Sequence, residues 1–475
     1  MQYFVGIDGG SQSTKVLIID EHGNVVASDV EPLKKTIARK LGWVEHPDDD
    51  LWDTLKIATK RLMDRWDGDK SQIKGVGLCT IRCCRTFMDA EGNLVEPVMS
   101  WMDVRSYEKF INEDRIRYTA PTTGYMAHRL TGKFVDTAAN AFQWQFPVDI
   151  DTWNWSEDEA YFNSFEIPRE KLLDLMQPGE ILGTVTKEAS ELTGLPIGLP
   201  VVATGNDKAV EGLGAGLIHD DTALISLGTY IASMVCGKGN AKDPVNYWTN
   251  LSCIPGRYLY ESNGIRRGMW HVSWLKSIIG EEYEKKAASL GLPTEELLAL
   301  DAKDVPPGSD GLLTIPDWLA PADQLYRKGV MIGFDERHTR GHIYRSILES
   351  IAMTLKNQYD GMIQELGIKP KKIIISGGGS NSDLFMQIFA DMYGVTTVRN
   401  VMNGAAGLGG AICAAVATGV YADFDEAVAH MVRVKDEFTP NPEATKAYDQ
   451  INTEVYSKLP ALLEPTLKTM YRVLG

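Results

Sequence analysis

Two strand–turn–strand segments, one at the start of the chain and one near its middle, constrain the fold more than any other feature. Residues 6–20 read GIDGGSQSTKVLIID, and residues 222–236 read TALISLGTYIASMVC. In both, runs of β-forming residues flank a short turn with glycine and hydroxyl side chains, which is typical of a β-hairpin with a polar tip. The recurrence of this plan predicts two lobes of related design.

The rest of the chain alternates strand-like and helical patterns. Apolar runs such as KGVGLCT, PVVAT and KKIIISG are separated by segments with helical periodicity, so the sequence predicts a mixed α/β fold. A polar stretch broken by Gly and Pro near residues 240–255 is the expected boundary, which gives lobes of 1–245 and 246–475. Residues 404–420 consist mainly of small side chains, and we expect a buried helix that other elements approach closely.

Composition excludes several classes of partner. The formal net charge of −16 disfavours nucleic acid and anionic membranes, and no basic patch offsets it. The six cysteines lack the paired spacing of a zinc site, so we expect reduced thiols. The sequence enters a strand at once without a signal-peptide pattern, and no segment is long enough for a membrane span. A cytoplasmic protein is therefore expected.

Polar groups on the turns indicate what they hold. Asp8 precedes the first turn (residues 9–13), and Lys15 follows it. Backbone amides and hydroxyls of such a turn can bind phosphate oxygens, while the carboxylate holds hydrated Mg²⁺. The second turn (residues 226–230) and a third (residues 377–382, before a helix expected to begin near Asp383) are also rich in glycine. One such turn is weak evidence, because glycine occurs in most α/β loops, but three favour a nucleotide site.

These motifs resemble those of the FGGY family of carbohydrate kinases, within the actin-like ATPase superfamily. Further similar blocks are GWVEHPDDDLW, WMDVR, GNDKAVEGLGAG, PPGSDGLLTIP and GVMIGFDERHTRGHIYRSILES, the last with Phe334 where an aliphatic residue is usual. The resemblance implies a two-lobed actin-like ATPase (ribonuclease H-like) α/β fold with its active site in the interlobe cleft. It also implies ATP and Mg²⁺ as cofactors and phosphoryl transfer to a small sugar or sugar alcohol.

The resemblance assigns roles to individual residues. Asp8 would organise the metal, the third turn would receive adenosine, and Asp207 would be the general base that takes the hydroxyl proton. The residues expected to bind ATP are Gly10, Ser11, Gln12, Ser13, Lys15, Gly228, Thr229, Gly378, Gly379, Asn381 and Asp383. The alternative for Asp207 is a helix N-cap.

The expected sugar pocket contains Arg82, Trp101, Asp103 and Arg105, because a polyol needs charged groups for its hydroxyls and an aromatic wall for its C–H face. Alternatively, Trp101 belongs to the core, and Asp103 pairs with Arg105 at the surface. The chain is shorter than the family norm between Trp101 and His128, and it has Arg82-Cys83 where glycerol kinases have Arg-Glu. Both differences lie on the sugar side, so the identity of the sugar and of the phosphorylated hydroxyl stays open.

A second function from another class is a nucleotide-driven conformational ATPase, which would use the same cleft without a small-molecule acceptor. Ketopentoses, glycerol, four-carbon polyols and deoxy sugars all remain candidate acceptors under the first hypothesis. Dimers are common in the family, so a homodimer is also compatible with the sequence.

Overall fold

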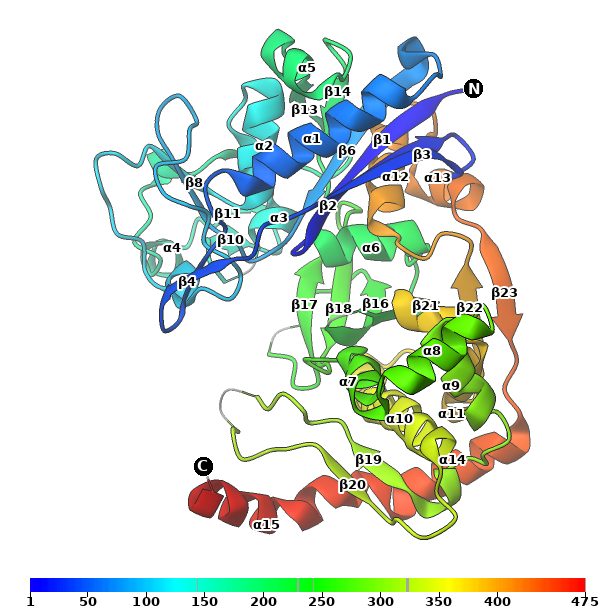
Figure 1. Cartoon of the computed structure of the whole chain (residues 1–475). Coiled ribbons are helices and arrows are strands. Elements are labelled where there is room, and N and C mark those ends of the chain that lie inside the picture. Colours follow the sequence, from blue (N-terminus) through cyan, green and yellow to red (C-terminus); the bar gives the residue numbers. More distant parts are fainter. Residues whose placement is uncertain (143, 229, 242, 322–323, 475) are drawn as a thin grey trace.

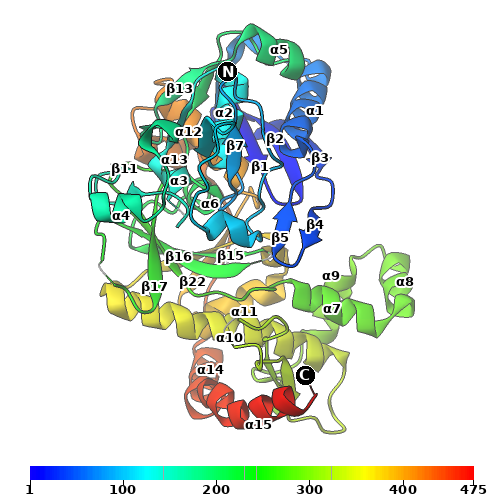
Figure 2. The same ribbon diagram turned by 90° about the vertical axis from the view of Figure 1, so that its left-hand side faces the viewer.

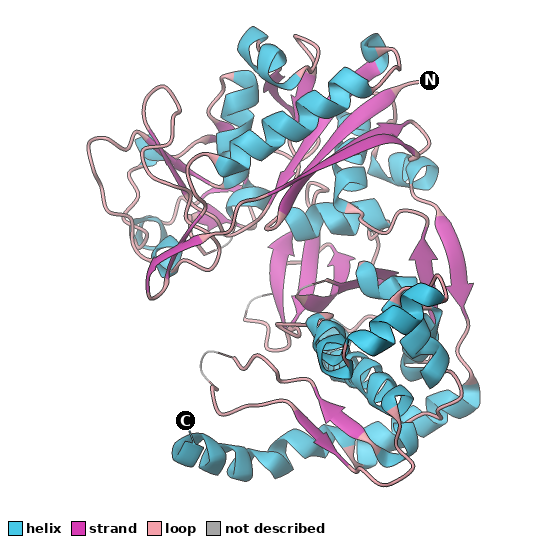
Figure 3. Ribbon diagram, viewed as in Figure 1, coloured by secondary structure: helices cyan, strands magenta, loops and turns pink. Residues whose placement is uncertain are grey.

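The computed structural model describes residues 1–142, 144–228, 230–241, 243–321 and 324–474. Two lobes, each built on a central sheet, lie one above the other (Figure 1). Helices cover both sheets (Figure 3). No helix among the described residues is long and apolar enough to cross a membrane.

The first sheet forms the centre of the upper lobe in Figure 1. Its strand order is β13 (Ile181–Thr184), β14 (Pro200–Val202), β6 (Ile73–Thr80), β1 (Tyr3–Gly9), β2 (Ser13–Asp20) and β3 (Val25–Pro32). One face packs against α1 (Asp50–Arg65) and α2 (Thr122–Thr131), and α5 (Lys187–Thr193) packs against both helices. Strands β1 and β2 form the first predicted hairpin, with Gly10 N–H donating to the Ser13 carbonyl across the turn at 3.0 Å.

The second sheet lies below the first and contains the second predicted hairpin. Its strand order is β17 (Tyr247–Leu251), β18 (Tyr258–Ser262), β16 (Ile231–Gly237), β15 (Thr222–Leu227), β21 (Lys372–Ser376), β22 (Thr396–Asn400) and β23 (Val434–Phe438). The long helix α10 (Arg340–Leu366) runs beneath this sheet (Figure 2). Further helices of this lobe are α7 (Trp270–Ile279), α8 (Glu281–Ser289), α9 (Thr294–Ala302), α11 (Asp383–Tyr393), α14 (Pro442–Glu454) and α15 (Leu459–Leu474).

Short elements complete the two lobes. The small sheets pair β4 (Ile37–Lys40) with β5 (Trp43–Glu45), β7 (Thr86–Met88) with β8 (Tyr118–Ala120), β9 (Val135–Thr137) with β12 (Asp174–Met176), β10 (Val148–Asp149) with β11 (Asn154–Trp155), and β19 (Leu313–Ile315) with β20 (Val330–Ile332). Further α-helices are α3 (Ala138–Ala141), α4 (Glu159–Asn163) and α13 (Phe424–Met431).

Two helices lie between the sheets, α6 (Asp207–Ala215) and α12 (Ala406–Ala417) (Figure 1). Helix α12 is the buried helix expected within residues 404–420, and it packs on β1 and β6 of the first sheet. The close approach of α12 to β6 requires glycine at position 77, because a Cβ added there would stand 1.9 Å from the Gly410 carbonyl oxygen. The second half of the chain therefore supplies part of the core of the first lobe.

The sheet topology differs from the boundary expected near residues 240–255. Strand β15 pairs with β21 in parallel and with β16 in antiparallel fashion, so the second sheet begins at Thr222. Residues 240–255, which suggested the boundary, follow β16 and contain β17, and both strands belong to the second sheet. Turn-forming composition marks any exposed connection, whether it joins two lobes or two strands.

Candidate functional site

A pocket of about 420 Å³ opens between the lobes. We call it the interlobe pocket. It is lined by Ser11, Ile81, Arg82, Cys83, Trp101, Tyr107, Trp144, Asp207, Lys208, Gly228, Tyr230, Trp248, Arg266 and Leu319. The structure thus brings together the first turn, the second turn, the proposed base and two residues of the expected sugar pocket.

Asp207 lies at the start of α6, at the wall of the interlobe pocket. The N-cap is Asn206, whose side chain accepts from the backbone N–H groups of Lys208 and Ala209. The N-cap alternative therefore applies to the preceding residue, although Asp207 also accepts from the Lys208 N–H at 2.9 Å. Burial raises the pKa of Asp207, and the positive charges of Arg82 and Lys208 oppose that rise.

Arg82 links the two lobes at this pocket. It follows β6 in the first sheet, and its guanidinium makes two hydrogen bonds of 3.0 Å to Glu261 on β18 of the second sheet. Glu261 is fully buried, and the Arg82 Nε also stands 3.5 Å from the Asp207 carboxylate. Both carboxylates favour the charged guanidinium, and the two hydrogen bonds to Glu261 fix it beside Asp207, the proposed base.

Aromatic side chains form much of the pocket wall. Trp101 is 45% exposed and lines the pocket, so it is not a core residue. The Arg82 guanidinium carbon lies over the Trp248 ring, 5.0 Å from its centre. Trp144 packs against Trp248 with ring centres 5.2 Å apart. Flat apolar surfaces beside charged groups suit a ligand with C–H faces and hydroxyls.

Two pocket residues other than glycine have left-handed backbone. The φ angles are 63° at Cys83 and 62° at Trp144. The Gln145 side chain donates to the Cys83 carbonyl at 2.7 Å, which ties the two segments together. Such conformations cost free energy and persist where surrounding contacts enforce them, often at functional sites.

The first turn brings Asp8 and Ser11 to the same region. Asp8 stands opposite Lys15 in the β1–β2 register, and Ser11 lines the interlobe pocket. Burial raises the pKa of Asp8 to about 6; Lys15 opposes this rise, whereas Asp207 and Glu211 add to it. Negative charge therefore accumulates around this turn.

The second and third turns leave neighbouring parallel strands. Ser226 of β15 and Ser376 of β21 are register partners, so Gly228 and the third turn follow at the same sheet edge. Gly378, Gly379 and Asn381 belong to a 3₁₀ turn and do not line the interlobe pocket. Asp383 begins α11 and accepts from Arg399 at 2.8 Å. Thr229 lies outside the described residues.

Asp103 is not brought to the pocket. It is fully buried, accepts from Val44 N–H at 2.8 Å, and binds Arg105 through both oxygens. Arg105 also reaches Glu45 and stacks on Trp43. Asp103 and Arg105 thus pair with each other, as the alternative proposed, but in a buried network that braces the chain next to Trp101.

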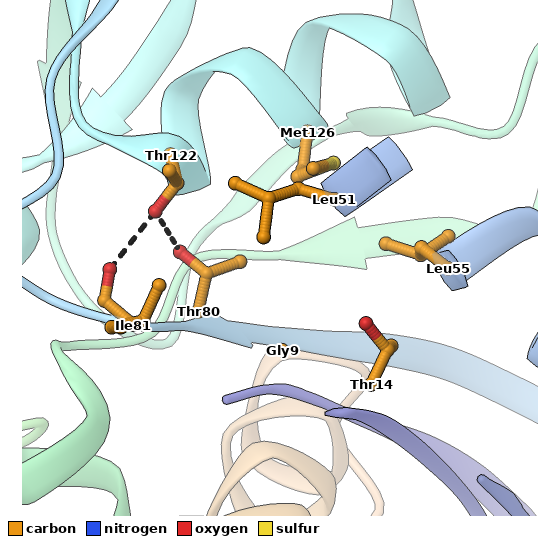
Figure 4. Close-up of a pocket in the computed structure, with 8 residues that line it drawn as sticks. All are labelled: Gly9, Thr14, Leu51, Leu55, Thr80, Ile81, Thr122 and Met126. Carbon is orange, nitrogen blue, oxygen red and sulfur yellow. Dashed lines mark hydrogen bonds between the residues drawn. The ribbon is translucent and has the colours of Figure 1, made fainter. Parts of the chain in front are cut away.

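A second cavity lies next to the first turn, between the end of the β1–β2 hairpin and helices α1 and α2 (Figure 4). It measures about 10 Å³, between Gly9 and the side chains of Thr14, Thr80 and Thr122. Thr80 and Thr122 hydrogen-bond to each other at 2.7 Å, and Thr122 donates to the Ile81 carbonyl. This space suits at most one water molecule and excludes a sugar.

Several residues of the pocket have no counterpart in the sequence predictions. They are Tyr107, Trp144, Lys208, Trp248, Arg266 and Leu319, with Glu261 behind Arg82. Lys208 could have been found from its position next to Asp207. The others carry no local signal, because they come from loops and strands far apart in sequence.

Comparisons with known proteins agree along the chain. The sequence matches the FGGY family of carbohydrate kinases, N-terminal domain, over residues 3–117 and 112–214, and the C-terminal domain of that family over residues 223–418. A protein of Escherichia coli (strain K12) named uncharacterized sugar kinase YgcE is 49% identical over 475 residues, covering 100% of this chain and 96% of that protein.

Solved structures show the same architecture. The xylulose kinase from Rhodospirillum rubrum superposes with a TM-score of 0.84 at 22% identity, covering 98% of this chain and 100% of the other. The gluconate kinase from Lactobacillus acidophilus also gives a TM-score of 0.84, at 19% identity, covering 98% and 99%. The predicted two-lobed fold is confirmed.

Proposed function

The chain belongs to the FGGY family of carbohydrate kinases, and from this premise we propose that Asp207 is its general base and the interlobe pocket its acceptor site. Membership makes the chain a phosphotransferase with a sugar or polyol acceptor, and the kinase family implies ATP as the donor. The acceptor we propose is a small sugar or sugar alcohol.

One observation carries this proposal: a single pocket is lined by Ser11 of the first turn, Gly228 of the second turn and Asp207. A hydroxyl bound there would have a carboxylate beside it and two glycine-rich turns close by. Arg82 and the aromatic walls supply hydrogen-bond donors and C–H contacts for the remainder of the acceptor.

The reaction places specific demands on these residues. The acceptor oxygen forms a bond to the γ-phosphorus, the bond from that phosphorus to the bridging oxygen breaks, and ADP leaves with the electron pair. Asp207 accepts the hydroxyl proton. Arg82, held by Glu261, keeps its charge beside Asp207 and so favours the ionised carboxylate that a base requires.

The residues around Asp8 fit a hydrated Mg²⁺. Burial raises the pKa of Asp8 to about 6, and the nearby carboxylates of Asp207 and Glu211 add to that rise, which is an electrostatic setting that a divalent cation relieves. Among the described residues, no group of three or more His, Cys, Asp or Glu side chains is placed to hold a metal. Mg²⁺ in kinases is bound by one or two carboxylates together with water and phosphate oxygens, so Asp8 would hold it through water molecules.

Coupled detection of ADP release over a panel of acceptors tests the proposal. Ketopentoses, tetritols, pentitols, glycerol, deoxy sugars and aldonates should be offered with ATP and Mg²⁺, and the correct acceptor should appear as a phosphate ester by mass spectrometry. Asp207→Asn should lower turnover by about 10²- to 10⁴-fold while ATP affinity persists. A constant basal hydrolysis over the whole panel, unchanged in Asp207→Asn, would instead favour the conformational ATPase.

A further inference from the structure

Lys208 is a cation of the interlobe pocket to which the preceding mechanism gives no role. Its Nζ donates to Glu211 Oε2 at 2.9 Å and to Ser226 Oγ at 2.8 Å. An ammonium group has three N–H donors, and these are the two acceptors found for it among the described residues. The side chain is 14% exposed and lines the interlobe pocket, so one N–H remains for a ligand there.

Glu211 holds this ammonium group in place. Its Oε2 also accepts from the Ser226 hydroxyl at 3.0 Å, and its Oε1 accepts from the Ser376 hydroxyl at 3.2 Å. Ser226 begins the second turn, and Ser376 directly precedes the third. One partly buried carboxylate therefore ties α6, which carries Asp207, to both nucleotide-side turns of the second sheet.

The other cations of the region are differently placed. Arg82 directs two hydrogen bonds to Glu261, and Arg266 is an exposed residue whose guanidinium donates to the Ala320 carbonyl. The Lys15 Nζ lies toward Gly404, 3.7 Å from where a Cβ on that glycine would be. Lys208 thus combines partial burial, a fixed position and a spare donor between the proposed base and the second turn.

We propose that Lys208 is a catalytic residue that binds the transferred γ-phosphoryl group, and that Glu211 is its positioning residue. This rests on the proposed function. As the phosphorus–oxygen bond to ADP breaks and the bond to the acceptor oxygen forms, the hydroxyl proton passes to Asp207. Lys208 keeps its own proton throughout and stabilises the negative charge on the non-bridging oxygens.

Nucleotide binding tests the contact without any acceptor. Titration calorimetry with ADP and with a non-hydrolysable ATP analogue should compare the native protein with Lys208→Met. Because ADP lacks the γ-phosphate, we expect affinity for the analogue to fall about 10-fold and affinity for ADP to change less than about 2-fold. Lys276→Met is the matched control, since Lys276 pairs with Glu295 away from the pocket, and it should alter neither affinity.

Equal weakening of ADP and the analogue, or no weakening, would overturn the proposal. The calorimetric result does not depend on the acceptor panel. A panel in which no acceptor is phosphorylated would remove the proposed function, whereas the change in analogue affinity relative to ADP affinity tests only the role of Lys208.

A double variant distinguishes two roles of Lys208, which are binding of the γ-phosphoryl group and neutralisation of the Glu211 charge. Lys208→Met leaves the partly buried Glu211 carboxylate without its cation, which lowers stability by itself. Lys208→Met/Glu211→Gln removes that charge, so the melting temperature should recover while kcat stays about 10²- to 10³-fold low. If the double variant recovers both kcat and the native ratio of analogue affinity to ADP affinity, then Lys208 only neutralises the charge of Glu211. Lys208→Arg should regain part of the activity.

Discussion

Replacing Glu261 with Ala measures how much the buried ion pair between Arg82 and Glu261, which joins the lobes, contributes to stability. Arg82 is 16% exposed, and Glu261 is its bidentate partner with both contacts at 3.0 Å. Removal of Glu261 leaves the guanidinium with the longer 3.5 Å contact to Asp207 as its only carboxylate contact among the described residues, in a site that water reaches poorly. Breaking a buried pair in this way costs about 3–5 kcal/mol.

This cost converts into a melting temperature. An unfolding entropy of about 2 cal/mol/K per residue gives about 1 kcal/mol/K for 475 residues that unfold cooperatively. Glu261→Ala should therefore lower the melting temperature by about 3–5 °C. The KM of the acceptor should rise as well, because Arg82 loses the partner that fixes it beside Asp207.

Differential scanning calorimetry measures the shift, and the chain offers a matched comparison. Asp317 also accepts two hydrogen bonds from one guanidinium, that of Arg327, at 2.9 and 3.0 Å through Nε and Nη2, but the pair is more exposed. Asp317→Ala should cost about 1 kcal/mol or less, which corresponds to about 1 °C. If Glu261→Ala shifts the melting temperature no more than Asp317→Ala, the argument from burial is refuted.

Three further outcomes are expected. Gly378→Val should weaken ATP binding far more than acceptor binding by calorimetry, because the new side chain would occupy space assigned to adenosine. The variant should fold, since nothing lies within 4 Å of the added Cβ. Unchanged ATP affinity would remove the adenosine assignment. Gly77→Ala should cost about 1–3 kcal/mol, because its Cβ would overlap the Gly410 carbonyl, and an unaltered melting temperature would contradict the close packing of α12. Burial lowers the pKa of His46 from 6.5 to about 4, so the unfolded chain binds its proton at higher pH than the folded chain. The free energy of unfolding should then fall by about 2 kcal/mol between pH 7 and pH 5, and His46→Leu should remove that part of the dependence in thermal scans at both pH values.

The sequence by itself determined the features that depend on neighbouring residues. Both hairpins, the buried helix of small residues and the helix beginning at Asp383 appear where local patterns predicted them. Hydrophobic period, turn composition and capping residues act over a few positions, so they can be recognised without knowledge of the fold. The family motifs added the order of the three turns and the candidate base.

Only the tertiary structure decided which of these segments meet. The second sheet begins at Thr222 because β15 pairs with β21, a strand far along the chain, and α12 crosses back to support the first sheet. Glu261 reaches Arg82 across 179 positions, whereas Asp103 turns away from the pocket into a network with Arg105 and Val44. Hydrogen-bond pairing of strands and burial of charges depend on distances in space between residues remote in sequence, and no local pattern encodes those distances.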